Sequence, residues 1–195
     1  MPFSDPKHLL LHILRAWGIA RRYLITNGFD GSLTMLGMMT GFYTSGMTEL
    51  PVAINACLGA AVALFVSGLC SAYLSEKAER EKELQELEQA LLHDLGESDY
   101  GHASRYLPFL VALANGLAPL IFSVLIIAPL QLAEHGFTST HSPFLDAIAI
   151  ALCCIFLLGV FLGKISKSHW FMAGVRTLLI AAVTMAIIFL FGHNG

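Results

Sequence analysis

Four stretches of this sequence are long and almost free of charged residues, and they restrict the fold more than any other feature. They are Val52–Leu74, Leu107–Leu130, Phe144–Gly163 and Phe171–Phe191. An α-helix rises about 1.5 Å per residue, so ~20 residues cross a hydrocarbon core of ~30 Å. Lipid offers the backbone no hydrogen-bond partner, so stretches that span it must be helical. A fifth stretch, Tyr23–Ser45, is equally long and contains one acidic residue, Asp30. The sequence therefore predicts an all-α, polytopic membrane protein with five transmembrane helices.

The composition supports a membrane protein and argues against a soluble domain. Only 13% of the residues are charged and the mean hydropathy is +0.69, whereas soluble domains average roughly 25% charged residues. The formal net charge is −3, and no surface rich in basic and aromatic residues indicates a nucleic-acid partner. We expect an integral, multi-pass protein of the plasma (inner) membrane in a prokaryote, or of a vacuolar-type membrane in a eukaryote.

The basic residues alternate between the two sides of the predicted membrane. Outside the predicted spans, three segments contain them: Lys7, Arg15, Arg21 and Arg22 before the first span; Lys77, Arg80, Lys82 and Arg105 after the second; Lys164 and Lys167 after the fourth. Residues 46–51, residues 131–143 and the C-terminal tail have no Lys or Arg. Because basic residues favour the cytosolic side, this alternation predicts a cytosolic N-terminus and a C-terminus on the opposite side.

The chain divides into four parts on these grounds. Residues 1–22 are predicted to form an interfacial amphipathic helix, and residues 23–74 the first two transmembrane helices. Residues 75–106 are predicted to form a cytosolic acidic helix that ends near Leu95, followed by a polar loop, Gly96–Tyr106. Residues 107–195 then form transmembrane helices three to five.

Asp30 is the most informative residue of the first span. A carboxylate inside a membrane costs at least ~2.5 kcal/mol on insertion scales, and such residues usually mark a path for ions or protons. Five residues share its face of the predicted helix: Thr34, Gly37, Met38, Gly41 and Ser45. This face combines a charge, a hydroxyl group, a thioether and glycines. The alternative is that Asp30 caps a helix break at Asn27-Gly28.

The second span has a row of small residues on one side: Ala56, Ala60, Ala63, Ser67 and Ser71. Small residues let membrane helices approach closely. We therefore expect this row to pack against the first span or against a partner subunit.

The predicted acidic helix has four glutamates on one face: Glu76, Glu79, Glu83 and Glu86. Carboxylates on a rigid helix are hard oxygen ligands suited to a divalent cation, especially if a second subunit brings its own row. Lysine and arginine residues at helical spacing allow the other interpretation, a solvated helix with internal salt bridges. The spacing alone does not decide between the two.

The remaining spans show packing residues and no catalytic pattern. There is no nucleophile–base arrangement, Gly-rich phosphate loop or zinc-ligand spacing, so we do not expect an enzyme. The four cysteines lie inside predicted spans without CxxC spacing, which is typical of small packing residues rather than disulfides.

These residues together resemble the vacuolar iron transporter family, which exchanges iron or manganese for protons. The resemblance spans nearly the whole chain. It rests on Asn27-Gly-Phe-Asp30-Gly31, on the small-residue second span that leads through Tyr73-Leu74 into the acidic helix, and on Gly174-Val-Arg-Thr-Leu-Leu-Ile near the C-terminus. It implies a homodimer whose first two spans line the cation path, with Asp30 as a central ligand. It also implies a cytosolic glutamate-rich domain that collects metal.

The chain departs from that family in three respects. Where the family often has a methionine and a glutamate in the second span, this chain has Gly68 and Ala60; Met35, Met38 or Met39 is a substitute soft ligand, with Met38 best placed. The family's cytosolic domain has further helices, which are replaced here by a short loop. Some of its metal-binding glutamates correspond to Ala90 and His93.

The sequence thus predicts a homodimeric exporter of cytosolic Fe²⁺ or Mn²⁺ that works by proton antiport, with no permanently bound cofactor. The predicted metal ligands are Asp30, Thr34, Met38, Glu76, Glu79, Glu83 and Glu86. The competing prediction is a membrane scaffold or metal sensor that retains the fold without transport.

Overall fold

The computed structural model describes residues 6–137, 142–167 and 169–192, and within them the chain is helical without any strand. The helices are α1 (Pro6–Thr44), α2 (Leu50–Leu91), α3 (Asp99–Glu134), α4 (Pro143–Ile165) and α5 (Trp170–Gly192). Four of the described helices, α2 to α5, are long and apolar enough to cross a membrane. The all-α prediction is confirmed, and the chain is built like a multi-pass membrane protein.

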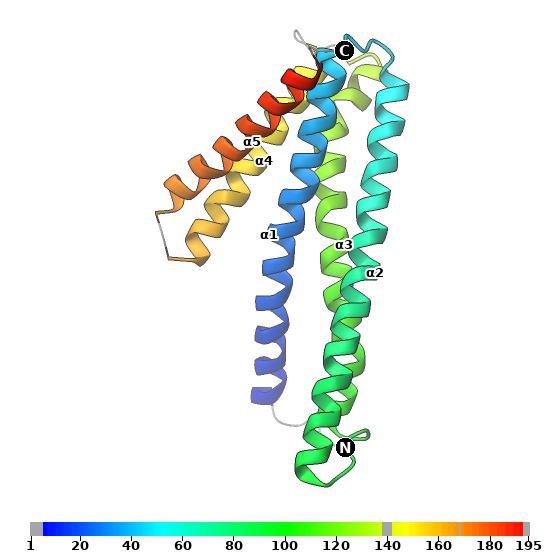
Figure 1. Ribbon diagram of the computed structural model, residues 1–195, viewed down its shortest axis with the longest axis vertical. Coiled ribbons are helices and arrows are strands. Elements are labelled where there is room, and N and C mark those ends of the chain that lie inside the picture. The colour runs from blue at the N-terminus through cyan, green and yellow to red at the C-terminus, as the bar shows by residue number, and fades with distance from the viewer. Residues whose placement is uncertain (1–5, 138–141, 168, 193–195) are drawn as a thin grey trace.

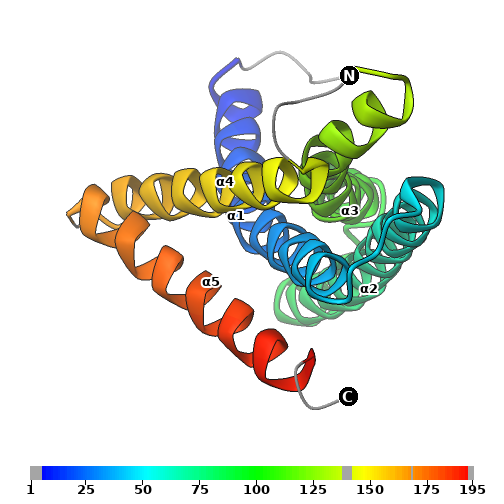
Figure 2. The same cartoon turned by 90° about the horizontal axis from the view of Figure 1, so that it is seen from above.

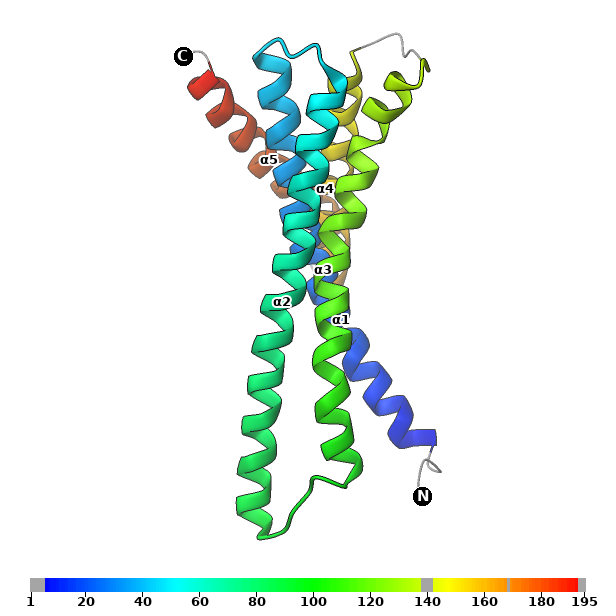
Figure 3. The same ribbon diagram turned by 90° about the vertical axis from the view of Figure 1, so that its right-hand side faces the viewer.

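Helices α2 and α3 form a long antiparallel hairpin, and α1 packs mainly against α3 (Figure 1). The hairpin extends far beyond the loop that joins α4 to α5, and its tip lies at one end of the molecule (Figures 1 and 3). Helices α4 and α5 form a shorter hairpin whose loop end stands away from α1, as the view from above shows (Figure 2). The molecule therefore has a five-helix half and a half that consists mainly of α2, α3 and the start of α1.

The apolar core lies in the five-helix half, where α1 is enclosed by α3, α4 and α5. Its fully buried members include Met35, Leu36, Met39, Ile126, Ile127, Leu130 and Ile155. Large apolar side chains also cover the outside of the helices; Val62, Leu157 and Leu179 are each more than half exposed. Apolar residues on all sides of a helix are typical of a helix in lipid.

Small residues hold α4 and α5 together. A Cβ atom added to Gly163 would lie 2.7 Å from the Cβ of Ala173, and one added to Gly159 would collide with the Thr177 side chain. The Thr177 hydroxyl donates to the Ile155 carbonyl oxygen at 3.1 Å. Gly159 and Gly163 thus form a GxxxG pair, which lets two membrane helices approach closely.

Three predicted boundaries differ from the helices. Helix α1 runs without interruption through Arg22, so the predicted interfacial segment, from Pro6 onward, is continuous with the predicted first span; residues 1–5 lie outside the described part. The polar loop predicted for Gly96–Tyr106 is shorter, because α3 already begins at Asp99. The reason is an N-cap, since the Ser98 hydroxyl accepts from the Gly101 backbone N–H at 3.1 Å. The acidic helix, predicted to end near Leu95, ends at Leu91.

Candidate functional site

The Asn27-Gly-Phe-Asp30-Gly31 segment gives α1 two different faces. Its glycines press against α3: a Cβ atom on Gly28 would lie 2.6 Å from the Phe122 ring, and one on Gly31 would lie 2.7 Å from the Pro119 Cα. The helix does not break at Asn27-Gly28, so the alternative that Asp30 caps a break there is wrong. The glycines serve helix packing, and Asp30 projects from the other side.

Asp30 lies on the face of α1 that is open in the single chain. Its side chain is exposed, while Thr34 and Met38 are half-buried. The Thr34 hydroxyl donates to the Asp30 backbone carbonyl at 2.7 Å, which leaves the lone pairs of the hydroxyl oxygen available. A Cβ atom on Gly41, two turns beyond Thr34, would meet no atom within 4 Å. The described residues provide no salt bridge to Asp30.

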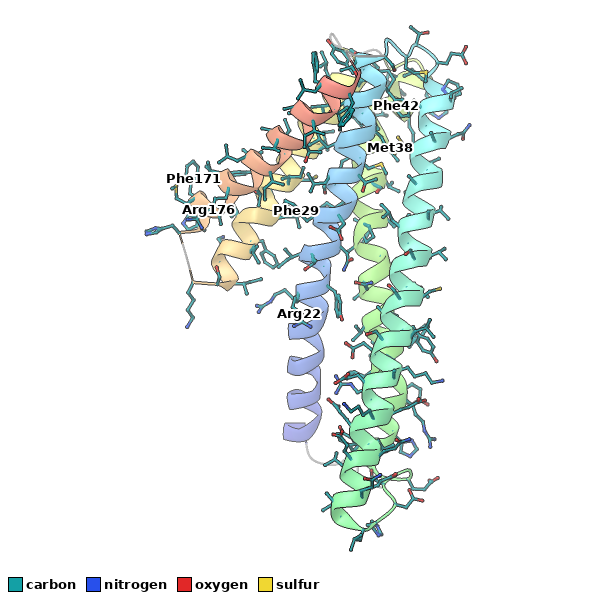
Figure 4. The ribbon with its side chains drawn as sticks, viewed as in Figure 1. Arg22, Phe29, Met38, Phe42, Phe171 and Arg176 are labelled. Atoms are coloured by element: carbon teal, nitrogen blue, oxygen red, sulfur yellow. The ribbon has the colours of Figure 1, made fainter. Side chains whose placement is uncertain are left out.

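Of the three methionines considered as soft ligands, Met38 alone lies at the edge of this open face. Met35 and Met39 are fully buried in the core. Figure 4 labels Met38 together with Phe42 on the upper part of α1. The predicted ligands Asp30, Thr34 and Met38 therefore follow one another along one side of α1.

The row of small residues on α2 is also open. Ala56, Ala63, Ser67 and Ser71 are exposed and Ala60 is half-buried. Helices α1 and α2 touch only slightly, because α3 fills the groove between them. Within one chain the row does not pack against the first span, so the partner subunit is the remaining alternative.

Gly68 does not belong to that row. A Cβ atom there would lie 3.3 Å from the Asn115 side-chain nitrogen, so a methionine at this position would point into α3. The Gly68 carbonyl instead accepts from the Asn115 Nδ2 at 2.6 Å. Ala60, the other position at which the chain departs from the vacuolar iron transporter pattern, is half-buried and packs against the apolar core.

Asn115 also ties α1 to this junction. Its Oδ1 accepts from the Asn27 Nδ2, which donates to the Tyr23 carbonyl as well, at 3.0 Å. Asn115 is only 5% exposed, and a buried amide is costly unless its hydrogen bonds are made. One buried side chain therefore links α1, α2 and α3 one turn before Asp30.

The acidic helix is organised around Arg80. Its Nη1 lies 2.6 Å from the Glu83 Oε2, and its Nη2 lies 3.5 Å from the Glu76 Oε2. Two tyrosines complete the group: the Tyr23 hydroxyl donates to Glu76 at 3.3 Å, and the Tyr100 hydroxyl donates to Glu83 at 3.2 Å. Burial and the Glu83 carboxylate raise the pKa of the Tyr100 phenol.

The four predicted glutamates thus fall into two pairs. Glu76 and Glu83 are held by Arg80, whereas Glu79 is exposed and Glu86 makes only a loose, exposed contact with Lys82 at 3.9 Å. In the part of one chain that the structure describes, no three His, Cys, Asp or Glu side chains are grouped closely enough to hold a metal ion. Within the described residues, these glutamates therefore do not form a complete set of metal ligands by themselves.

The polar groups form a line that leads from the acidic helix towards Asp30. Glu83, Arg80, Glu76 and Tyr23 follow one another through the contacts given above. Tyr23 lies on the Asp30 face of α1, seven residues before it, or about 10 Å along the axis. Tyr23 and Arg80 were not among the metal ligands predicted from the sequence. The signal that could have identified Tyr23 is its position two helical turns before Asp30 on the same face of the helix.

Replacing Arg80 with Gln tests whether the acidic helix can bind a cation. The change removes the counter-charge of two partly buried carboxylates, and we expect unfolding to become easier by about 1–2 kcal/mol. Mn²⁺ should restore the melting temperature of this variant and shift that of the unchanged protein little, because the freed carboxylates are suitable oxygen ligands. Circular dichroism melting with and without Mn²⁺ measures both effects.

The matched control is Lys77→Gln, which removes an exposed pair with Glu81 at 3.7 Å and should change stability by less than about 0.5 kcal/mol. If Mn²⁺ leaves the melting temperature of the Arg80 variant unchanged, Glu76 and Glu83 serve the scaffold alone.

Comparison with known proteins gives one significant relative and no family model. No family model matches the sequence. Over 171 residues the chain is 32% identical to the "Uncharacterized protein MJ0645" of Methanocaldococcus jannaschii, with 86% of this chain and 85% of that protein covered. The similarity therefore extends over most of the length of both proteins.

Proposed function

The chain belongs to the same family as the uncharacterized protein MJ0645 of Methanocaldococcus jannaschii, and we propose that it is a transporter of divalent metal cations. The cation would be Fe²⁺ or Mn²⁺, carried out of the cytosol in exchange for protons. The observation that carries the proposal is Asp30, an acidic side chain in the middle of a long helix, exposed on the open side of α1 and without a salt bridge among the described residues.

The proposed site lies between two copies of the chain. One Asp30 carboxylate per chain is too little for a divalent cation, whereas two would match its charge and its preference for oxygen ligands. The open face of α1 and the exposed small-residue row on α2 support a homodimer, since small residues suit close contact between membrane helices. Thr34 and Met38 would add an oxygen and a sulfur ligand on either side.

The proposed topology has five spans, with the N-terminus in the cytosol and the C-terminus on the opposite side. The α2–α3 hairpin and the start of α1 extend past the α4–α5 loop at the same end of the molecule (Figure 1). All three regions contain the lysines and arginines that favour the cytosolic side. In this arrangement the acidic helix projects into the cytosol and Asp30 lies in the span that follows the N-terminal segment.

Proton exchange follows from the chemistry of a carboxylate. A deprotonated Asp30 attracts the cation, and a proton that returns to it removes the charge and weakens binding. The resemblance to the vacuolar iron transporter family supports this cycle, because that family exchanges iron or manganese for protons.

A flux assay tests the proposal. The protein in proteoliposomes is given Fe²⁺, Mn²⁺, Co²⁺ or Zn²⁺ outside, with the interior either acidic or at the outside pH. We expect Fe²⁺ or Mn²⁺ uptake to increase when the interior is acidic and to return to the equal-pH rate when a protonophore abolishes the gradient. Uptake at the rate of protein-free liposomes for all four metals would contradict transport.

The competing proposal is a membrane scaffold or metal sensor. The salt bridges from Arg80 to Glu76 and Glu83 favour it, because they give the acidic helix a structural role. Binding of metal without flux in the same preparation would support this second function.

A further inference from the structure

Besides the acidic Asp30, the described spans contain a basic residue, Arg176. It is the seventh residue of α5 and lies about 9 Å along the helix from Trp170. Figure 4 labels it with Phe171 at the end of α5 that adjoins the α4–α5 loop. A cation at this depth in lipid is costly unless it reaches the surface or finds an anion.

The packing of α4 and α5 fixes the direction of Arg176. Its neighbour Thr177 is 8% exposed and bonded to the Ile155 carbonyl of α4, and Gly159 packs against the same threonine. Adjacent residues of a helix differ in direction by about 100°, so Arg176 is turned away from this interface. Its side chain is accordingly exposed.

Helices α4 and α5 contain one acidic residue, Asp146, and it lies in the first turn of α4, at the other end of the hairpin from Arg176. From Ala147 to the C-terminus the sequence contains no Asp or Glu. The described residues also give Arg176 no salt bridge, and Asp30 is not its partner. The same end of the hairpin contains two more cations, Lys164 and Lys167, both exposed.

The apolar surface around Arg176 indicates what faces it. Trp170, Phe171 and Met172 are each more than half exposed, and Leu179 is 62% exposed. Tryptophan is enriched at the membrane–water interface, and an arginine within reach of that interface extends its guanidinium towards the headgroups. Three cations beside exposed aromatic and aliphatic side chains match a molecule that has a negative head and an apolar tail.

We propose that Arg176, with Lys164 and Lys167, binds the phosphate of an anionic phospholipid at the loop end of the α4–α5 hairpin. The guanidinium is suited to this ligand because its planar array of donors can bond two phosphate oxygens at once. The lipid supplies the counter-charge that the loop end of the hairpin lacks. This site is separate from Asp30 and does not depend on the transport proposal.

Native mass spectrometry of the full chain, titrated with phosphatidylglycerol, tests the site. A basic residue near an anionic membrane surface contributes about fivefold in binding. We expect Arg176→Gln to lower the affinity for phosphatidylglycerol about fivefold, and replacement of all three cations by Gln to lower it about a hundredfold. Arg176→Lys keeps the charge but not the paired donors, so it should bind more weakly than the unchanged protein and more tightly than Arg176→Gln, which separates lost charge from lost folding.

Two controls define the ligand. Lys82→Gln removes the same charge from the extension of α2, where the side chain is 70% exposed, and should leave lipid binding unchanged. Phosphatidylcholine should bind Arg176→Gln and the unchanged protein equally, and millimolar inorganic phosphate should not displace phosphatidylglycerol.

Equal phosphatidylglycerol binding by Arg176→Gln and the unchanged protein would overturn the proposal. Displacement by inorganic phosphate would replace the lipid with a simple anion and would overturn it too. If Arg176→Gln instead dissociates a dimer while lipid binding stays constant, Arg176 pairs with an acid of a second chain and the lipid assignment is wrong.

Discussion

Replacing Asp30 with Asn is expected to abolish metal uptake into proteoliposomes. Asn keeps the size of the side chain and removes its charge. Removing an outer-shell partner of a metal site lowers activity roughly 10–100-fold, so removing the charge of a direct ligand should lower uptake by more than that. Asp30 is exposed and has no salt bridge in the described chain, so the variant should stay folded. Its uptake rate is measured with Mn²⁺ and an acidic interior.

The matched control is Asp146→Asn, which neutralises the acidic residue in the first turn of α4. Asp146 lies outside the open face of α1, and its replacement should leave uptake within about twofold of the unchanged rate. Unchanged uptake by the Asp30 variant would remove the central ligand from the mechanism. Cross-linking of the same samples shows whether the proposed dimer persists.

Among the Gly→Ala substitutions in α1, Gly31→Ala is expected to lower the stability of the protein most. The new Cβ atom would lie 2.7 Å from the Pro119 Cα, and backbone cannot move aside as a flexible side chain can. Overpacking typically costs about 1–3 kcal/mol, and we expect the upper end of that range here. For a chain of this size, such a loss lowers the melting temperature by on the order of 5–10 °C.

Gly18→Ala is the corresponding control on the same helix. A Cβ atom there would meet nothing within 4 Å, and alanine is about 1 kcal/mol better than glycine in a helix interior. The control should therefore melt at the same temperature or higher. A Gly31 variant that melts like the control would mean that α1 and α3 are not held at this distance in the membrane.

The helical architecture was predictable because lipid leaves a spanning chain few choices. The long uncharged stretches predicted α2 to α5, which the structure bears out as four helices suited to crossing a membrane. Residues 99–106 were wrongly assigned to a loop because the N-cap that starts α3 early depends on one hydroxyl, Ser98. A polar sequence alone does not distinguish such a cap from an ordinary loop.

The site was predictable only in part, because side-chain pairing depends on which helices become neighbours. The face of Asp30, Thr34 and Met38 follows from helical spacing within one segment. The partners of Glu76 come partly from α1, however, and those of Glu83 partly from α3, which no periodicity within α2 can show. Asn115 gave a usable signal, since an amide inside an apolar stretch needs a partner.

Helix α2 runs from Leu50 to Leu91 without a break, and this continuity has a mechanical consequence. Its 42 residues make a rod about 63 Å long, attached to α3 near Gly68. A rotation of about 5° around that point would move the far tip by about 3 Å and the opposite end by about 2 Å the other way. A stiff helix of this kind transmits a force applied near Leu91 to the row of alanines and serines in its half nearer Leu50.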